Sequence, residues 1–75
     1  MTLTECPTRL RVRITAVGVA EEMLVRAHEM GLRCGAVVRV THHGAFGGVV
    51  IAVGAARVAI DGATARCVQV EPVAA

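Results

Sequence analysis

The sequence predicts a mainly β domain: a small barrel of about five short strands, with one α-helix between the first and second strands. Three observations support this fold class. Residues 9–17 alternate strictly between apolar and polar side chains, as in a strand with one buried face. Residues 20–30 carry apolar side chains at helical spacing. The later part of the chain consists of short Val- and Ile-rich runs separated by glycine-containing turns.

Length and composition indicate one domain over residues 1–75 with a thin core. The chain has 75 residues, 55% of them hydrophobic, but Phe46 is its only aromatic residue. Aliphatic side chains must therefore build the core, and we expect a small free energy of unfolding. The residues expected to be buried are Leu10, Val12, Ile14, Leu24, Val38, Val40, Ile51, Val58, Ile60 and Val68.

The helix carries the most consistent local signals in the chain. It follows the strand at residues 9–17 and has no strong side-chain cap at its start. Gly31 comes directly after the apolar stripe and suits the left-handed residue that ends many helices. We therefore expect the helix to end at Met30, with Leu32 packing back onto Ala27.

Four further strands are expected after the helix. Gly35 provides a positive φ in the turn before them, and a hairpin loop of about five residues, 44–48, joins the first two. A flat sheet of this size would leave its edges exposed, so we expect it to curl into a barrel whose open end the helix plugs. The expected elements are strands at 37–42, 49–53, 57–60 and 67–70, a single helical turn at 63–66, a lead-in at 1–8 and a tail at 71–75.

Composition excludes several classes of protein. The longest uncharged run, residues 40–56, is interrupted by four glycines and lacks the roughly 20 mainly apolar residues that a membrane span needs. No signal peptide is visible, so we expect a soluble cytoplasmic protein. Three widely spaced cysteines without a C-x-x-C pair indicate reduced thiols.

The sequence shows no catalytic set and no metal-ligand spacing. No Ser-His-Asp or Cys-His pattern is present, and the glycine-rich loop lacks the lysine of a phosphate-binding loop. His42 and His43 are adjacent on an expected strand and should point to opposite faces, which prevents both from binding one ion. We predict no enzyme activity, no cofactor and no dedicated metal site.

Arg9, Arg11 and Arg13 form a basic stripe on one face of the first strand, and Arg39 and Arg57 could extend it. The stripe is either the solvated face of a half-buried strand or a contact for an acidic partner surface or anionic headgroups. Eight arginines against six acidic residues give a net charge of only +2. We do not expect nucleic-acid binding, because no aromatic stacking platform accompanies the arginines.

Phe46 is the other candidate contact residue. It lies in the loop at residues 44–48, between glycines. A large apolar side chain in a surface loop either packs back on the barrel or inserts into a partner. Both alternatives are open from the sequence.

The order of these motifs resembles the FeoA family, ferrous iron transport protein A. The most specific pieces are RAHEMGLRCG at residues 26–35 and CVQVE at residues 67–71. The resemblance implies an SH3-like barrel that acts on the cytoplasmic side with the membrane ferrous iron transporter FeoB. It is compatible with a homo-oligomer. The alternatives from other classes are a metal-binding carrier or sensor domain and a nucleic-acid-binding small barrel.

Overall fold

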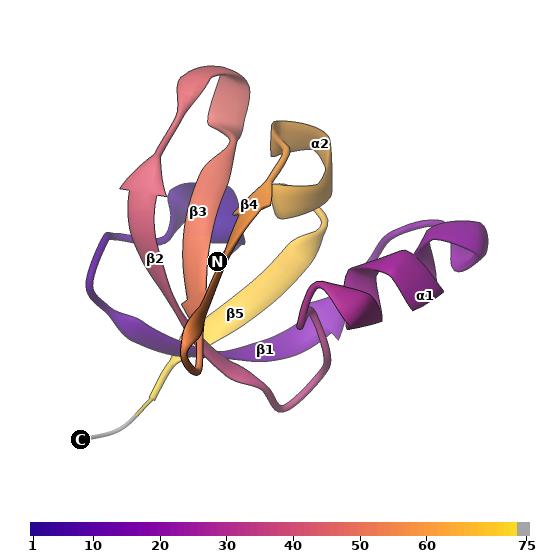
Figure 1. The fold of residues 1–75 in the computed structure, drawn as a ribbon, viewed down its shortest axis with the longest axis horizontal. Helices are drawn as coiled ribbons and strands as arrows, with labels where there is room; N and C mark the ends of the chain where they lie inside the picture. The colour runs from indigo at the N-terminus through magenta and orange to yellow at the C-terminus, as the bar shows by residue number, and fades with distance from the viewer. Residues whose placement is uncertain (74–75) are drawn as a thin grey trace.

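Five strands form one antiparallel sheet in the order β4-β3-β2-β1-β5 (Figure 1). The computed structural model describes residues 1–73. The sheet curls as the sequence predicts, into the SH3-like arrangement that the family resemblance implies, but β4 and β5 do not pair, so the predicted barrel stays open between them. The elements are η1 (Leu3–Glu5), β1 (Arg11–Val17), α1 (Glu21–Glu29), β2 (Val37–His43), η2 (Ala45–Gly47), β3 (Val49–Val53), β4 (Ala56–Ile60), α2 (Gly62–Ala65) and β5 (Val68–Pro72).

The two ends of the chain contain more structure than the sequence predicts. Glu71 and Pro72 belong to β5 and not to a tail, while residues 74–75 of the expected tail lie outside the described residues. Near the N-terminus, Thr2 forms a bridge with Gln69, and the 3₁₀ turn η1 follows. The first residues thus add a short backbone pairing to the outer edge of β5.

The core lies inside the curl of the sheet and is entirely hydrophobic. Seven of the ten predicted core residues are buried, and Leu10 and Val58 are half-buried against them. The prediction was wrong for Leu24, which is not buried and does not belong to the core cluster. The buried set is Leu3, Cys6, Val12, Ile14, Ala27, Leu32, Val38, Val40, Val49, Ile51, Ile60, Ala65, Val68 and Val70.

The error at Leu24 follows from the position of α1. The helix extends away from the sheet and does not plug a barrel end, contrary to the prediction (Figure 1). Ala27 is its only buried residue. At about 100° per residue, Ala27 and Met30 share one face with Met23, whereas Leu24 lies on the flank of that face. No helix among the described residues is long and apolar enough to cross a membrane.

The end of α1 confirms the predicted cap. Gly31 has a φ of +90°, and its N–H donates to the carbonyl of His28 at 3.0 Å. The N–H of Leu32 donates to the carbonyl of Ala27 at 2.9 Å, which completes a Schellman motif. Leu32 and Ala27 are both buried. This turn therefore attaches the C-terminal end of α1 to the core.

Replacing Gly31 by valine is expected to lower the free energy of unfolding by about 1–3 kcal/mol, because a β-branched residue resists positive φ. A Cβ at this position would also lie 3.0 Å from Cγ1 of Val53. Thermal melting of Gly31→Val measures the effect, with Gly31→Asn as a control because asparagine tolerates this conformation better. A Gly31→Val melt that overlays the parent would contradict the cap assignment.

Leu32→Ala is expected to cost about 2–5 kcal/mol, because the side chain is fully buried. The matched change Leu24→Ala should cost less than about 1 kcal/mol, since Leu24 lies outside the core cluster. Urea denaturation of the two variants measures the difference. Equal losses at the two positions would show that the flank of α1 packs as tightly as the turn that follows it.

Candidate functional site

Phe46 lies on the surface, at the tip of the loop between β2 and β3. Its side chain is 95% exposed, and its backbone adopts the left-handed conformation with φ 57° and ψ 31°. The ring therefore does not pack back on the barrel, which was one of the two alternatives from the sequence. A bulky residue in this conformation stores about 1–3 kcal/mol of strain, and such strain is concentrated at functional sites.

Hydrogen bonds within the loop hold the backbone on both sides of Phe46. The N–H of Gly44 donates to the carbonyl of Gly48 at 2.8 Å, and the N–H of Gly48 donates to the carbonyl of Ala45 at 3.1 Å. From outside the loop, the Thr4 hydroxyl donates to the carbonyl of Gly47 at 3.5 Å. The loop is thus closed on itself and tied to η1.

The loop also packs against the start of α2. A Cβ built on Gly62 would collide with the carbonyl oxygen of Phe46, so the close approach of the two backbones requires glycine at residue 62. Asp61 caps α2: its carboxylate accepts the Thr64 hydroxyl at 2.7 Å and the Thr64 N–H at 3.3 Å. The hydrogen bond from the Thr64 side chain, with a smaller contribution from its N–H, lowers the pKa of the Asp61 carboxyl.

Arg9, Arg11, Arg39 and Arg57 form a second feature, the arginine patch, on the outer face of the sheet. All four side chains are exposed. Arg11 lies directly opposite Arg39 in the β1–β2 pair. Arg9 has a φ of 71°, and its N–H donates to the carbonyl of Val40 at 2.9 Å. Among residues 1–73, Arg9 and Phe46 are the non-glycine residues with positive φ.

Arg13, the third residue of the predicted stripe, has a different neighbour. It lies opposite Glu71 in the β1–β5 pair, so its cross-strand neighbour is acidic. Arg9 and Arg11 of the predicted stripe therefore lie in one patch with Arg39 and Arg57 of the neighbouring strands, and Arg13 lies at the edge of this patch. Strand register, which determines these neighbours, is not visible in the sequence.

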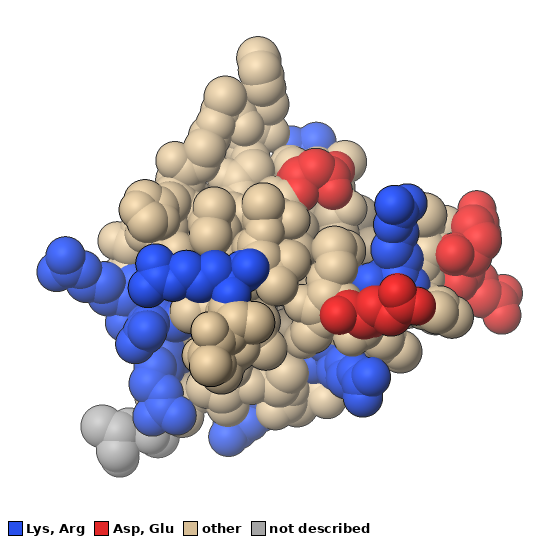
Figure 2. Space-filling view, viewed as in Figure 1, with Lys and Arg blue, Asp and Glu red and all other residues tan. Residues whose placement is uncertain are grey.

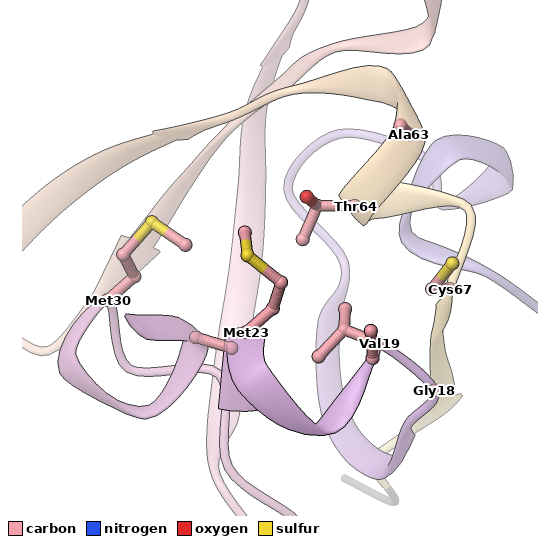
Figure 3. A pocket seen from close by; sticks show the side chains of 9 residues that line it. Gly18, Val19, Met23, Met30, Ala63, Thr64 and Cys67 are labelled. Carbon is pink, nitrogen blue, oxygen red and sulfur yellow. The ribbon is translucent and has the colours of Figure 1, made fainter. Parts of the chain in front are cut away.

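An apolar groove lies between α1 and α2. Figure 3 shows Met23 of α1 and Met30, the residue after α1, on one side of it and Thr64 of α2 and Cys67 on the other. Its volume is about 200 Å³. Met23 remains 40% exposed, because α1 extends away from the sheet. This groove is not predicted from the sequence, because the apolar stripe of the helix is expected there to lie against the core.

The histidines and cysteines do not gather. No group of three His, Cys, Asp or Glu side chains among residues 1–73 is arranged to hold a metal ion. His42 and His43 lie opposite Val50 and Val49, so they occupy opposite faces of β2, as predicted. A ring nitrogen of His43 lies 2.8 Å from the carbonyl of Cys6. Cys6 is buried, and burial raises the pKa of its thiol.

Comparison with known proteins matches residues 1–72 to the FeoA domain family. No protein with a curated description matches the chain.

Several solved structures are similar. A FeoA from Stenotrophomonas maltophilia, solved with zinc and described as an SH3 domain protein and a candidate activating factor for ferrous iron transport, is 30% identical with a TM-score of 0.76. That alignment covers 95% of this chain and 89% of that one. A FeoA described as an iron uptake regulatory protein is 25% identical with a TM-score of 0.88, covering 97% of both chains. FeoA from Chlorobium tepidum is 21% identical with a TM-score of 0.85, covering 99% of this chain and 71% of that one, and supports the fold.

Gly62→Ala is expected to lower the free energy of unfolding by about 1–3 kcal/mol, because the new methyl group would meet the Phe46 carbonyl and displace the loop. Gly44→Ala is the control within the loop: its Cβ would meet no atom closer than 3.7 Å, so its effect should stay within about 0.5 kcal/mol. Chemical denaturation of both variants measures the difference. Equal stability of the two variants would show that the loop does not depend on its contact with α2.

Proposed function

The chain belongs to the FeoA domain family, and from this membership we propose that it is an accessory protein of bacterial ferrous iron uptake. It acts by contact with a membrane transporter of the FeoB type on the cytoplasmic side and catalyses no reaction. The description of the Stenotrophomonas relative as a candidate activating factor for ferrous iron transport supports this pathway.

The exposed ring of Phe46 is the observation that carries the proposal. Aromatic side chains that enter a pocket of the partner supply much of the energy of small protein interfaces. Phe46 is the only aromatic residue of the chain, and solvent reaches 95% of its surface. A ring held this way gains free energy when a partner covers it.

The rigid backbone beneath the ring strengthens this argument. The hydrogen bonds of the loop and the packing of Gly62 fix the conformation of Phe46 before any partner is present. Little backbone entropy is then lost on binding, so more of the energy of the buried ring appears as affinity. Glycines on both sides of Phe46 would suit an adaptable loop, but hydrogen bonds hold this loop in one conformation.

Replacing Phe46 is expected to weaken binding to a purified FeoB-type transporter by about 30-fold or more, the effect of losing an interface anchor. Phe46→Asn is the sharpest variant, because asparagine accepts a positive φ and should leave the loop in place. Calorimetric titration in detergent measures the affinity, and uptake of radioactive Fe²⁺ by cells measures the function. Melting temperature should stay near that of the parent.

Val25→Ala is the matched control, since Val25 is an apolar side chain on α1 that is 67% exposed. It should leave binding, uptake and stability unchanged. Unaltered transporter binding in Phe46→Asn would exclude the ring as the contact. A variant that binds normally but melts well below the parent would instead assign Phe46 a structural role.

A further inference from the structure

The strand register arranges arginines in one row across the outer face of the sheet. Arg11 lies opposite Arg39, Arg39 lies opposite Ala52, and Ala52 lies opposite Arg57. The row therefore crosses β1, β2, β3 and β4 and carries three guanidinium groups. Arg9, two residues before Arg11, lies beside the row and completes the arginine patch.

This arrangement is unfavourable for the isolated protein. Like charges directly opposite each other on neighbouring strands repel and destabilise a sheet. Ala52 contributes only a methyl group between Arg39 and Arg57, and the arginine side chains line two hollows. One hollow of about 370 Å³ is lined by Arg9, Arg39, Val40, Thr41 and Arg57. The adjoining one, of about 260 Å³, is lined by Arg11, Val37, Val38, Arg39, Ala52 and Gly54.

Acidic side chains are absent from the lining of both hollows and are concentrated elsewhere. Three of the six acidic residues lie on α1: Glu21, Glu22 and Glu29. Figure 2 shows a group of basic side chains without acidic neighbours on the side of the sheet away from α1, whereas acidic and basic side chains are mixed on the α1 side. The positive charge that no acidic side chain offsets is therefore concentrated on the side of the molecule away from α1.

We infer that the arginine patch binds the surface of an anionic phospholipid membrane, with the guanidinium groups on lipid phosphates. This site is distinct from the Phe46 loop and does not rest on the proposed function.

A membrane is favoured over a protein partner because the patch has no exposed aromatic or other large apolar side chain at its centre, and protein interfaces usually have such an anchor. Mobile lipid headgroups can adapt to the uneven spacing of the row. Nucleic acid is disfavoured, because no base-stacking side chain lies among the arginines.

The expected affinity is modest and reversible. Each arginine near an anionic membrane surface strengthens binding about fivefold, so four of them together contribute several hundredfold. Such binding should weaken steeply as salt rises, because the Debye length falls from about 10 Å at 0.1 M to about 3 Å at 1 M.

Co-sedimentation with vesicles tests the inference. Vesicles of phosphatidylcholine with about one third phosphatidylglycerol should bind the protein at low salt, and vesicles of phosphatidylcholine alone should not. The double variant Arg39→Gln, Arg57→Gln should bind about 25-fold more weakly. The double variant Arg26→Gln, Arg33→Gln changes the net charge equally outside the patch and should bind as the parent does. Melting curves establish that both variants are folded.

Three outcomes would overturn the inference. Equal loss in the two double variants would show that net charge, and not the patch, attracts the protein. No binding to phosphatidylglycerol vesicles at low salt would exclude a membrane site, and binding of a poly-glutamate peptide in its place would assign the patch to an acidic protein. Complete release from vesicles by millimolar inorganic phosphate at constant ionic strength would assign it to a soluble phosphate ligand.

Discussion

The structure depends on burying one layer of mostly β-branched side chains inside a curled five-stranded sheet. Val12, Ile14, Val38, Val40 and Ile51 fill the interior of the curl, and all are buried. Because successive side chains of a strand point to opposite faces, burying these residues places their neighbours outside. The arginine patch follows from the same alternation: Arg11 and Arg39 flank Val12 and Val38 in sequence and are displayed because those valines are buried. Core and surface charge are therefore not independent features of this protein.

The open side of the barrel imposes a second requirement, which explains the Phe46 loop. With β4 and β5 unpaired, the chain crosses from one to the other through α2, and η1 lies against both α2 and β5. The loop between β2 and β3 then packs on these two short elements through Gly62 and Thr4. The two short elements beside the unpaired strands, α2 and η1, thus also hold the backbone of Phe46 in its conformation. This indicates why so small a domain can hold one surface side chain in a strained conformation.

Local signals predicted the fold well, whereas features that depend on register or tertiary packing could not be predicted. Alternation identified the strands, and Gly31 identified the end of α1, because both patterns reflect backbone geometry within a few residues. Leu24 was assigned to the core because its spacing suits the apolar stripe of a helix. How many residues of that stripe become buried depends on how the helix lies against the sheet, which the sequence does not show. Arg13 lies opposite Glu71 because β1 pairs with β5, and these two residues are 58 positions apart in the sequence. Local sequence patterns do not show which distant residues will face each other. In the sequence, Asp61-Gly62 indicates only a turn, and the contact of Gly62 with Phe46 depends on the positions of α2 and the loop.

The arginine patch and the Phe46 loop are stabilised by different parts of the structure. The arginine patch belongs to the regular sheet and persists as long as the core is packed. The Phe46 loop depends instead on its own hydrogen bonds and on its close contact with α2, which hold it in one conformation. A partner that covers Phe46 would stabilise these contacts as well as the ring, since binding energy adds to the stability of whatever conformation it requires. Binding at the Phe46 loop therefore adds to the stability of contacts that already hold the ring, whereas the position of the arginine patch depends only on the packing of the sheet.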